Sequence, residues 1–251
     1  MPAAPSVDPG EVDGFEALAA SWWDPDGPMR PLHRLNPARL SYIRDRLCEH
    51  FGHDPARLRP LSGLRLLDAG CGAGLLTEPL ARMGADLTGI DAGAEIVAVA
   101  RQHAAEAGLA IDYRCVAAET LASEGAQFDA IVCMEVVEHV ADLPAFMAAL
   151  TRLTRPGGAL LLSTLNRTAR AYASAIIGAE YLLRWLPAGT HDWSRFVRPA
   201  ELNRLLRPHG ATLKDVTGLS YQPTARDWHL SRDPSVNYLA FAVRDDHAGG
   251  G

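Results

Sequence analysis

The sequence predicts an α/β fold in which helices cover both faces of a mainly parallel sheet. From residue 64 onward, short apolar segments alternate with segments of helical periodicity, as a chain of βαβ units requires. Phe128–Met134 is an almost continuous apolar run, which is typical of a strand that is buried on both faces. A glycine-rich turn between the first expected strand and the first helix supports the same arrangement.

Each expected element is bounded by residues that start or stop regular structure. Gly108 ends an Ala-rich helix, Pro144 lies in the first turn of another, and Pro156–Gly158 forms a turn before a strand. Two last strands, the final one antiparallel, would complete a sheet of seven strands. The expected strands are Leu64–Asp68, Asp86–Asp91, Ala110–Val116, Phe128–Met134, Ala159–Thr164, Thr212–Leu219 and Asn237–Val243, and the helices between them are Leu75–Met83, Ala94–Ala107, Leu143–Leu153 and Pro199–Leu206.

The residues before the sheet are predicted to form a helical cap. Gly14–Trp23 is expected to be one helix, which the cluster Asp24–Pro28 ends. A second helix is expected to begin near Asn36, a good N-cap, with Pro37 at its first position. The predicted organisation is a disordered tail over 1–12, a single domain over 13–244 with the cap at 13–60 and an insertion at 166–193, and a disordered tail over 245–251.

Composition argues against several classes of function. The net charge is −6 and no long run of Lys and Arg occurs, so nucleic acid is not expected as a partner. The four cysteines include no C-x-x-C pair, which favours reduced cysteines of a cytosolic protein over a zinc or dithiol site. We expect no secretory signal, and no apolar run reaches the length of a membrane span.

The glycine-rich turn Asp68–Gly74 is the strongest functional motif in the chain. Its glycines occupy alternate positions, which lets the backbone turn tightly and lets a ligand approach closely. Asp91 ends the next expected strand, 17 positions after Gly74, and its carboxylate can accept both hydroxyls of a ribose. The spacing differs from the dinucleotide fingerprint G-x-G-x-x-G. The turn therefore predicts a nucleotide-type site at the mouth of the sheet, with a purely structural turn as the alternative.

Residues between the fifth strand and the next helix interrupt the alternation. Ala171–Gly178 and Tyr181–Leu186 are apolar, and Arg167, Arg170 and Arg184 flank them. Two interpretations remain open from this pattern: a pair of helices that lies on a membrane surface, or an ordinary helix that covers the edge of the sheet.

The turn Asp-x-Gly-x-Gly-x-Gly resembles motif I of the class I S-adenosylmethionine-dependent methyltransferases, which implies a Rossmann-like, seven-stranded sheet. Further motifs extend the resemblance to the ubiquinone biosynthesis O-methyltransferases over roughly residues 13–243. These motifs are Ser21–Asp24, Pro31–Leu40, Cys133–Val140, Ser163–Arg167, Gly178–Arg184, Pro187–Trp193, Thr217–Leu219 and Val236–Tyr238.

This resemblance implies a cofactor, substrates and cofactor-binding residues. The cofactor would be S-adenosylmethionine, and the substrates would be the ring hydroxyls of a 2-polyprenyl-6-hydroxyphenol and of 3-demethylubiquinol. Asp68 would orient the glycine loop, and Glu119 would lie near the adenine. The residues implied to bind the cofactor are Gly70 and Gly72 in the loop, Asp91 at the ribose, Met134 across the cleft, and Arg39 at the methionine carboxylate, which suits the planar fork of an arginine.

Deprotonation of the acceptor hydroxyl requires help, because a phenol has a pKa of about 10. The resemblance places Glu135, Glu138 and His139 at the mouth of the sheet. We expect His139 to act as base or metal ligand with Glu138 in support, and all three could hold Mg²⁺. The alternative is a structural histidine. His191 and Asp192 form a second candidate pair.

A polyprenyl tail is buried in a bilayer, so an enzyme of this kind would meet its substrate at a membrane surface. Residues 167–193 then become a candidate membrane contact and substrate gate, at the inner face of the cell membrane, and a coenzyme Q biosynthetic complex is a further candidate partner. Two other functions stay open. One is an O-methyltransferase for a soluble phenol or acid, which would not need the apolar insertion. The other is a cofactor-binding module without catalysis.

Overall fold

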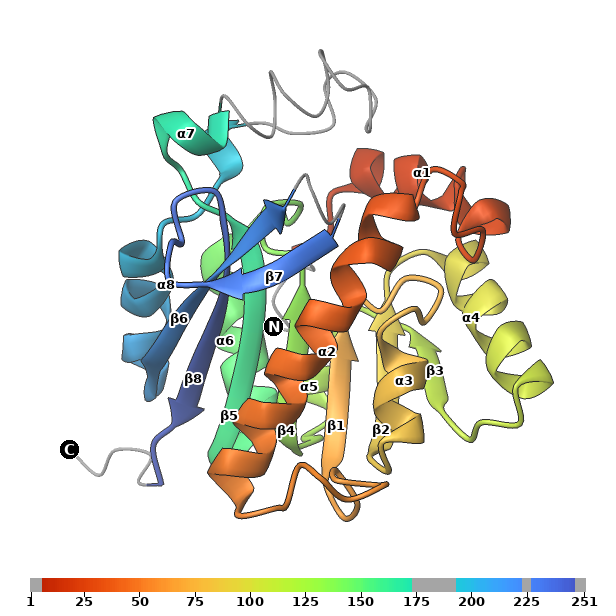
Figure 1. Cartoon of the computed structure of the whole chain (residues 1–251), viewed down its shortest axis with the longest axis horizontal. Coiled ribbons are helices and arrows are strands. Elements are labelled where there is room, and N and C mark those ends of the chain that lie inside the picture. The colour runs from red at the N-terminus through yellow and green to blue at the C-terminus, as the bar shows by residue number, and fades with distance from the viewer. Residues whose placement is uncertain (1–5, 173–192, 223–226, 247–251) are drawn as a thin grey trace.

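One mixed sheet organises the residues that the computed structural model describes, which are 6–172, 193–222 and 227–246. Its strand order is β3-β2-β1-β4-β5-β8-β6-β7 (Figure 1). β1 to β5 are parallel, β8 is antiparallel to β5 and β6, and β7 is antiparallel to β6. The strands are β1 (Arg65–Ala69), β2 (Asp86–Asp91), β3 (Asp112–Cys115), β4 (Phe128–Met134), β5 (Thr154–Leu165), β6 (Ala211–Gln222), β7 (Asp227–Ser231) and β8 (Asn237–Arg244).

The predicted parallel sheet and its final antiparallel strand are confirmed, but the described residues contain eight strands rather than seven. The additional strand, β7, forms an antiparallel pair with β6 at the edge of the sheet. Its side chains are half-buried or exposed, so no apolar run marks it in the sequence. Backbone pairing with β6 and the packing of Trp228 against the core hold this strand in place.

Helices cover both faces of the sheet, as predicted. Neighbouring residues of a strand point to opposite faces, so Leu66 packs with α2 and α3 whereas Leu67 packs with α5, α6 and α8. Figure 1 shows α2 crossing the near face of the sheet. The helices are α1 (Pro9–Glu16), α2 (Arg30–Phe51), α3 (Thr77–Arg82), α4 (Ala94–Glu106), α5 (Ala118–Ser123), α6 (Leu143–Leu153), α7 (Ala169–Ala171) and α8 (Pro199–Leu206), with the short 3₁₀ turns η1 (Ala19–Ser21), η3 (Trp193–Arg195) and η4 (Arg207–His209).

The N-terminal tail corrects one prediction. Disorder was expected over 1–12, but residues 6–12 are ordered: Ser6 is buried and α1 begins at Pro9. The Asp8 carboxylate caps this helix by accepting a hydrogen bond from Gly10 N at 3.1 Å. An acidic N-cap followed by proline is a sound helix start, and it outweighs the polar composition of the segment.

The helical cap also differs in its boundaries. The single helix expected over Gly14–Trp23 is replaced by the end of α1 and the short turn η1. α2 begins at Arg30 rather than near Asn36, because Pro31 already occupies its first turn and Pro37 is accommodated inside the helix. The earlier start adds almost two turns to the helix that carries Arg39.

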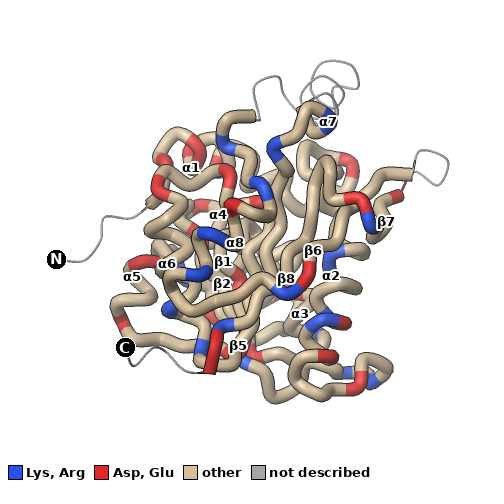
Figure 2. Tube along the Cα trace, turned by 90° about the vertical axis from the view of Figure 1, so that its left-hand side faces the viewer, with Lys and Arg blue, Asp and Glu red and all other residues tan. Residues whose placement is uncertain are grey.

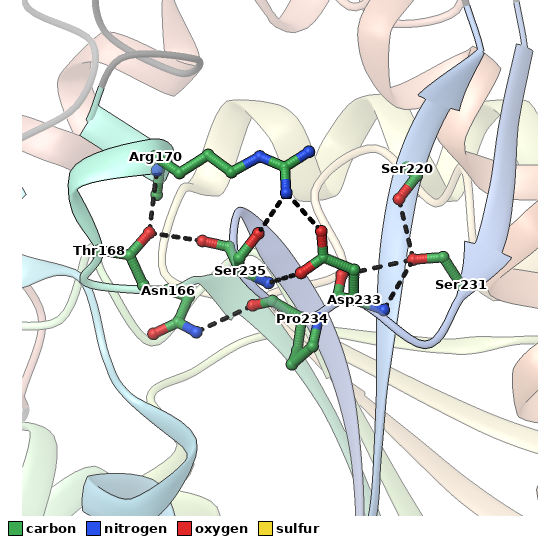
Figure 3. A network of polar contacts seen from close by, with 9 residues as sticks. Asn166, Thr168, Arg170, Ser220, Ser231, Asp233, Pro234 and Ser235 are labelled. Atoms are coloured by element: carbon green, nitrogen blue, oxygen red, sulfur yellow. Dashed lines mark hydrogen bonds and ion pairs between the residues drawn. The ribbon is translucent and has the colours of Figure 1, made fainter.

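Most of the predicted insertion at 166–193 falls outside the described residues, which stop at 172 and resume at 193. Its described start is tied to the loop between β7 and β8 (Figure 3). There Asn166 Nδ2 donates to Pro234 O at 2.8 Å and Thr168 Oγ1 donates to Ser235 O at 2.5 Å. No helix within the described ranges is long and apolar enough to cross a membrane.

Charged side chains of both signs are spread over the described chain. Figure 2 shows acidic and basic residues interspersed along the trace. A nucleic-acid surface needs a concentrated basic stripe, and this side of the described trace shows none.

Candidate active site

A cavity of about 1310 Å³ opens at the C-terminal edge of the parallel strands. Its lining comes from α1, α2 and the segments that follow β1, β2, β3, β4 and β5. Small-molecule pockets commonly measure about 300–1,000 Å³, so this one has room for two molecules side by side. It brings together the predicted site residues that lie in the described ranges: Arg39, Gly70, Gly72, Asp91, Met134, Glu135, Glu138 and His139. His191 and Asp192 lie outside the described residues.

Gly70 and Gly72 of the loop after β1 have φ angles of 77° and 51°, in the left-handed region that favours glycine. A Cβ on Gly72 would lie 2.6 Å from Cζ2 of Trp22, and one on Gly70 would collide with Val136. The glycines are therefore required by backbone conformation and by close packing against neighbouring side chains.

Asp91 at the end of β2 anchors this loop. Its Oδ2 accepts a hydrogen bond from Gly72 N at 2.9 Å, and its Oδ1 accepts one from Gly93 N at 3.0 Å. Burial raises the pKa of Asp91. Each carboxylate oxygen has two acceptor positions, so acceptor capacity remains on both oxygens for a ligand with paired hydroxyls.

Asp68 closes the other side of the loop. Its buried Oδ2 accepts a hydrogen bond from Thr77 Oγ1 at 2.6 Å, which joins the end of β1 to the first residue of α3. Burial raises the pKa of Asp68 to about 7. This contact supports the prediction that Asp68 orients the loop.

Arg39 of α2 is the buried cation of the cavity, with 3% of its surface exposed. Its Nη2 lies 3.0 Å from Glu135 Oε1, close enough for an ion pair, yet Nε and Nη2 have no hydrogen-bond partner with suitable geometry. Ser163 Oγ donates to the same Glu135 oxygen at 2.6 Å. Unused guanidinium donors beside a cavity fit a ligand carboxylate.

Glu135 is strained. Its φ of 56° makes it the one non-glycine residue with a positive φ among the described residues, and such a conformation costs of the order of 1–2 kcal/mol. Strained residues persist where the surroundings hold them, often at functional sites. Here the ion pair with Arg39 and the hydrogen bond from Ser163 hold the carboxylate.

Glu119 lines the cavity after β3 and holds the N-terminal segment. Its Oε1 accepts hydrogen bonds from the backbone N and the hydroxyl of Ser6. Its Oε2 is buried without a hydrogen-bond partner, so the cavity offers an acceptor at this position.

Glu138 and His139 follow β4 but have separate surroundings. Glu138 is buried, Thr164 Oγ1 donates to its Oε2 at 2.9 Å, and burial, followed by repulsion from Glu135, raises the pKa of Glu138 to about 8. His139 Nδ1 lies 3.0 Å from Oε2 of Glu11 on α1.

The three residues considered as possible Mg²⁺ ligands have different hydrogen-bond and ion-pair partners. Glu135 contacts Arg39, Glu138 contacts Thr164, and His139 contacts Glu11. Across the ranges the structure describes, no three His, Cys, Asp or Glu side chains gather closely enough to hold a metal ion. The described residues therefore give no support to Mg²⁺.

Comparison with known proteins decides the family. Residues 67–162 match the methyltransferase domain family. The ubiquinone biosynthesis O-methyltransferase of Sinorhizobium fredii is 53% identical over 242 residues, covering 96% of this chain and 98% of the relative. That of Parvibaculum lavamentivorans is 54% identical, with 96% of both chains covered. The chain belongs to the ubiquinone biosynthesis O-methyltransferase family.

Solved structures show the same methyltransferase fold for this family member. Magnesium protoporphyrin IX methyltransferase from Synechocystis, with bound SAH, superposes with a TM-score of 0.62 at 20% identity, covering 93% of this chain and 94% of that one. The plantazolicin methyltransferase, in complex with SAH, gives a TM-score of 0.58 at 20% identity, with 94% and 97% covered. The predicted fold class is confirmed.

Sequence reasoning missed three residues of the O-methyltransferase site. Glu11, the partner of His139, lay in the segment expected to be disordered. Trp22 packs on the glycine loop, although its motif was noted only for its resemblance. Asn237 is buried at the cavity, and its Oδ1 has no hydrogen-bond partner. The motif Val236–Tyr238 was a usable signal for Asn237, but it carried no assigned role.

Proposed function

We propose that this O-methyltransferase moves the methyl group of S-adenosylmethionine to a ring hydroxyl of a polyprenylated catechol or quinol, at both O-methylation steps of ubiquinone synthesis. The substrates are a 2-polyprenyl-6-hydroxyphenol and 3-demethylubiquinol. Identity above 50% over 96% of the chain carries the proposal. The two-molecule size of the cavity supports it, because cofactor and acceptor must be bound together.

The described residues fit S-adenosylmethionine. Arg39 would bind the methionine carboxylate with its unpaired guanidinium donors, and Asp91 would accept the ribose hydroxyls. Gly70 and Gly72 would carry the loop around the cofactor, and Met134 would contact it from the end of β4. The bound cofactor supplies a methyl group on a sulfonium, which is a good leaving group, so the protein has to position the acceptor and remove its proton.

His139 is the proposed base. With Nδ1 at Glu11, the carboxylate orients the ring, and the other ring nitrogen takes the proton from the phenol oxygen as that oxygen attacks the methyl group. Glu138 supports this step from its buried position. Because its pKa is raised to about 8, Glu138 keeps its proton at neutral pH, so it supports His139 rather than replacing it as the proton acceptor.

The experiment is methyl transfer from labelled S-adenosylmethionine to a short-tailed 2-polyprenyl-6-hydroxyphenol, with and without EDTA and Mg²⁺. We expect EDTA to leave methyl transfer unchanged, because the possible metal ligands Glu135, Glu138 and His139 each contact a different protein group. Transfer lost with EDTA and restored by Mg²⁺ would favour the metal alternative instead. No transfer, with cofactor still bound, would favour the methyltransferase for a soluble phenol or acid.

Membrane contact is a separate part of the proposal. The substrate tail requires access to a bilayer, and the apolar stretch within residues 167–193 suits contact with the inner face of the cell membrane. Charged substitutions at Ile176, Ile177 and Leu183 should weaken liposome binding, and unchanged binding would contradict this role. Assembly into a coenzyme Q biosynthetic complex is proposed on the same basis, with co-purification as its test.

A further inference from the structure

Asn237 lines the cavity on the side of β5, β8 and β6, away from the glycine loop that follows β1. It is the first residue of β8, where it pairs with Leu165 of β5 and Leu219 of β6, and all three residues line the cavity. β8 is three strands from β1 in the sheet, which is about 14 Å at the usual strand spacing. Asn237 therefore lines the same cavity as the glycine loop but stands apart from it, so its amide is available to a second molecule bound beside the cofactor.

The amide of Asn237 is a buried polar group without a protein partner. Only 5% of the residue is exposed, and Oδ1 has no hydrogen-bond partner among the described residues. By contrast, the buried amide of Asn166 in the adjoining segment has a protein partner, because its Nδ2 donates to Pro234 O at 2.8 Å. Native structures rarely leave such groups unpaired, and a site for a ligand is one accepted reason.

Polar contacts hold the loop that leads into Asn237. Arg170 Nη1 donates to Asp233 Oδ2 at 2.5 Å and to Ser235 Oγ at 3.2 Å (Figure 3). Gly218 of β6 has no side chain, and a Cβ there would collide with the Asp233 carbonyl. These contacts fix the start of β8, so the amide is positioned before any ligand binds, as selective recognition requires.

We propose that Asn237 selects substrates with two adjacent ring hydroxyls, by accepting a hydrogen bond from the hydroxyl that is not methylated. The inference rests on the proposed function and deepens it. Both proposed substrates keep a hydroxyl next to the methyl-accepting one. The neighbouring hydroxyl retains its proton while the methyl-accepting hydroxyl loses its own. The neighbouring hydroxyl can therefore donate a hydrogen bond to Asn237 Oδ1. A phenol without it leaves the buried amide unpaired and is disfavoured.

The test combines one substitution with one change of substrate. Asn237→Leu removes the acceptor and keeps a similar volume. A 3-polyprenylphenol keeps the methyl-accepting hydroxyl and lacks its neighbour, and a short-tailed 2-polyprenyl-6-hydroxyphenol has both. We expect Asn237→Leu to lower kcat/KM for the catechol by about 10- to 100-fold and to change that for the monophenol by less than about threefold.

Two variants act as controls. Asn237→Asp keeps an acceptor oxygen at the same place and should retain the preference for the catechol. Asn203→Leu removes an amide of α8 that accepts a hydrogen bond from Leu213 N and does not line the cavity, so it should change both substrates by the same factor. Removing an unpaired amide should also leave the Tm of Asn237→Leu equal to or above that of the wild type.

The outcomes separate this inference from the proposed function. If the wild type is active and Asn237→Leu lowers kcat/KM by the same factor for both phenols, the role of Asn237 is overturned and the proposed function stands. A wild type that binds S-adenosylmethionine but methylates neither phenol would overturn the proposed function, and this inference with it.

Discussion

Replacing Glu138 by glutamine should remove a large pH dependence of stability. Glu138 is buried beside Glu135, and its pKa is raised from 4.5 to about 8 in the folded protein. Between these values the folded state keeps a proton that the unfolded state releases. The free energy of unfolding therefore falls as pH rises through this window, and the penalty is absent below pH 4.5.

The size of the effect follows from the shift. Each pKa unit corresponds to about 1.4 kcal/mol, so the rise from 4.5 to about 8 sets an upper limit of about 5 kcal/mol on the stability lost by alkaline pH. Glutamine has nearly the same shape, does not titrate, and can still accept the hydrogen bond from Thr164. Asp68 also has a raised pKa, but it titrates in both proteins, so its contribution cancels when the free energies of unfolding of the variant and the wild type are subtracted.

Urea unfolding at pH 5, 7 and 8.5 measures this difference. Relative to wild type, Glu138→Gln should gain several kcal/mol between pH 5 and pH 8.5, with most of the gain between pH 5 and 8. Glu106→Gln, on an exposed position of α4, controls for the change of residue type and should show no such gain. A difference between Glu138→Gln and wild type that stays constant with pH would refute the reasoning.

Three other predictions concern the cofactor loop and the base. Gly72→Ala places a Cβ 2.6 Å from Trp22 at a φ of 51°, so it should lower the free energy of unfolding by about 1–3 kcal/mol. An unchanged Tm in thermal unfolding would contradict the close packing. Arg39→Lys removes the guanidinium fork and should weaken S-adenosylmethionine binding by about 10- to 100-fold by calorimetry. Glu11→Gln should lower kcat by about tenfold and leave the affinity for S-adenosylmethionine unchanged; loss of that affinity would show a structural role instead.

The sequence predicts the centre of the sheet well and its edges less well. Phe128–Met134 is apolar throughout because both faces of β4 are covered, and this double burial leaves a strong signal. Asp227–Ser231 carries no such signal, because β7 is a mostly exposed edge strand that pairs with β6 and packs on the core only through Trp228. Local sequence patterns reveal strands whose side chains are buried along their whole length, and they miss an edge strand that places mainly one side chain, Trp228, against the core.

The N-terminal segment shows a different limit. Asp8 and Pro9 follow ordinary helix-start rules, so α1 could have been found from the sequence despite the polar composition around it. Ser6 could not, because its burial depends on Glu119, 113 residues away. Contacts of that length have no periodicity, and only the folded chain brings the segment over the cavity.

The hypothesis that Glu135, Glu138 and His139 together hold Mg²⁺ gained no support from the described residues. Glu135, Glu138 and His139 are close in sequence, which suggests one cluster, but closeness along a loop does not fix the direction of side chains. Glu135 adopts a left-handed φ and contacts Arg39 of α2. Glu138 points to Thr164 of β5, while His139 lies against α1. These contacts therefore differ among the three groups: Glu135 contacts α2 and β5, Glu138 contacts β5, and His139 contacts α1. A short motif can identify which groups reach the mouth of the sheet, but their pairing depends on those elements.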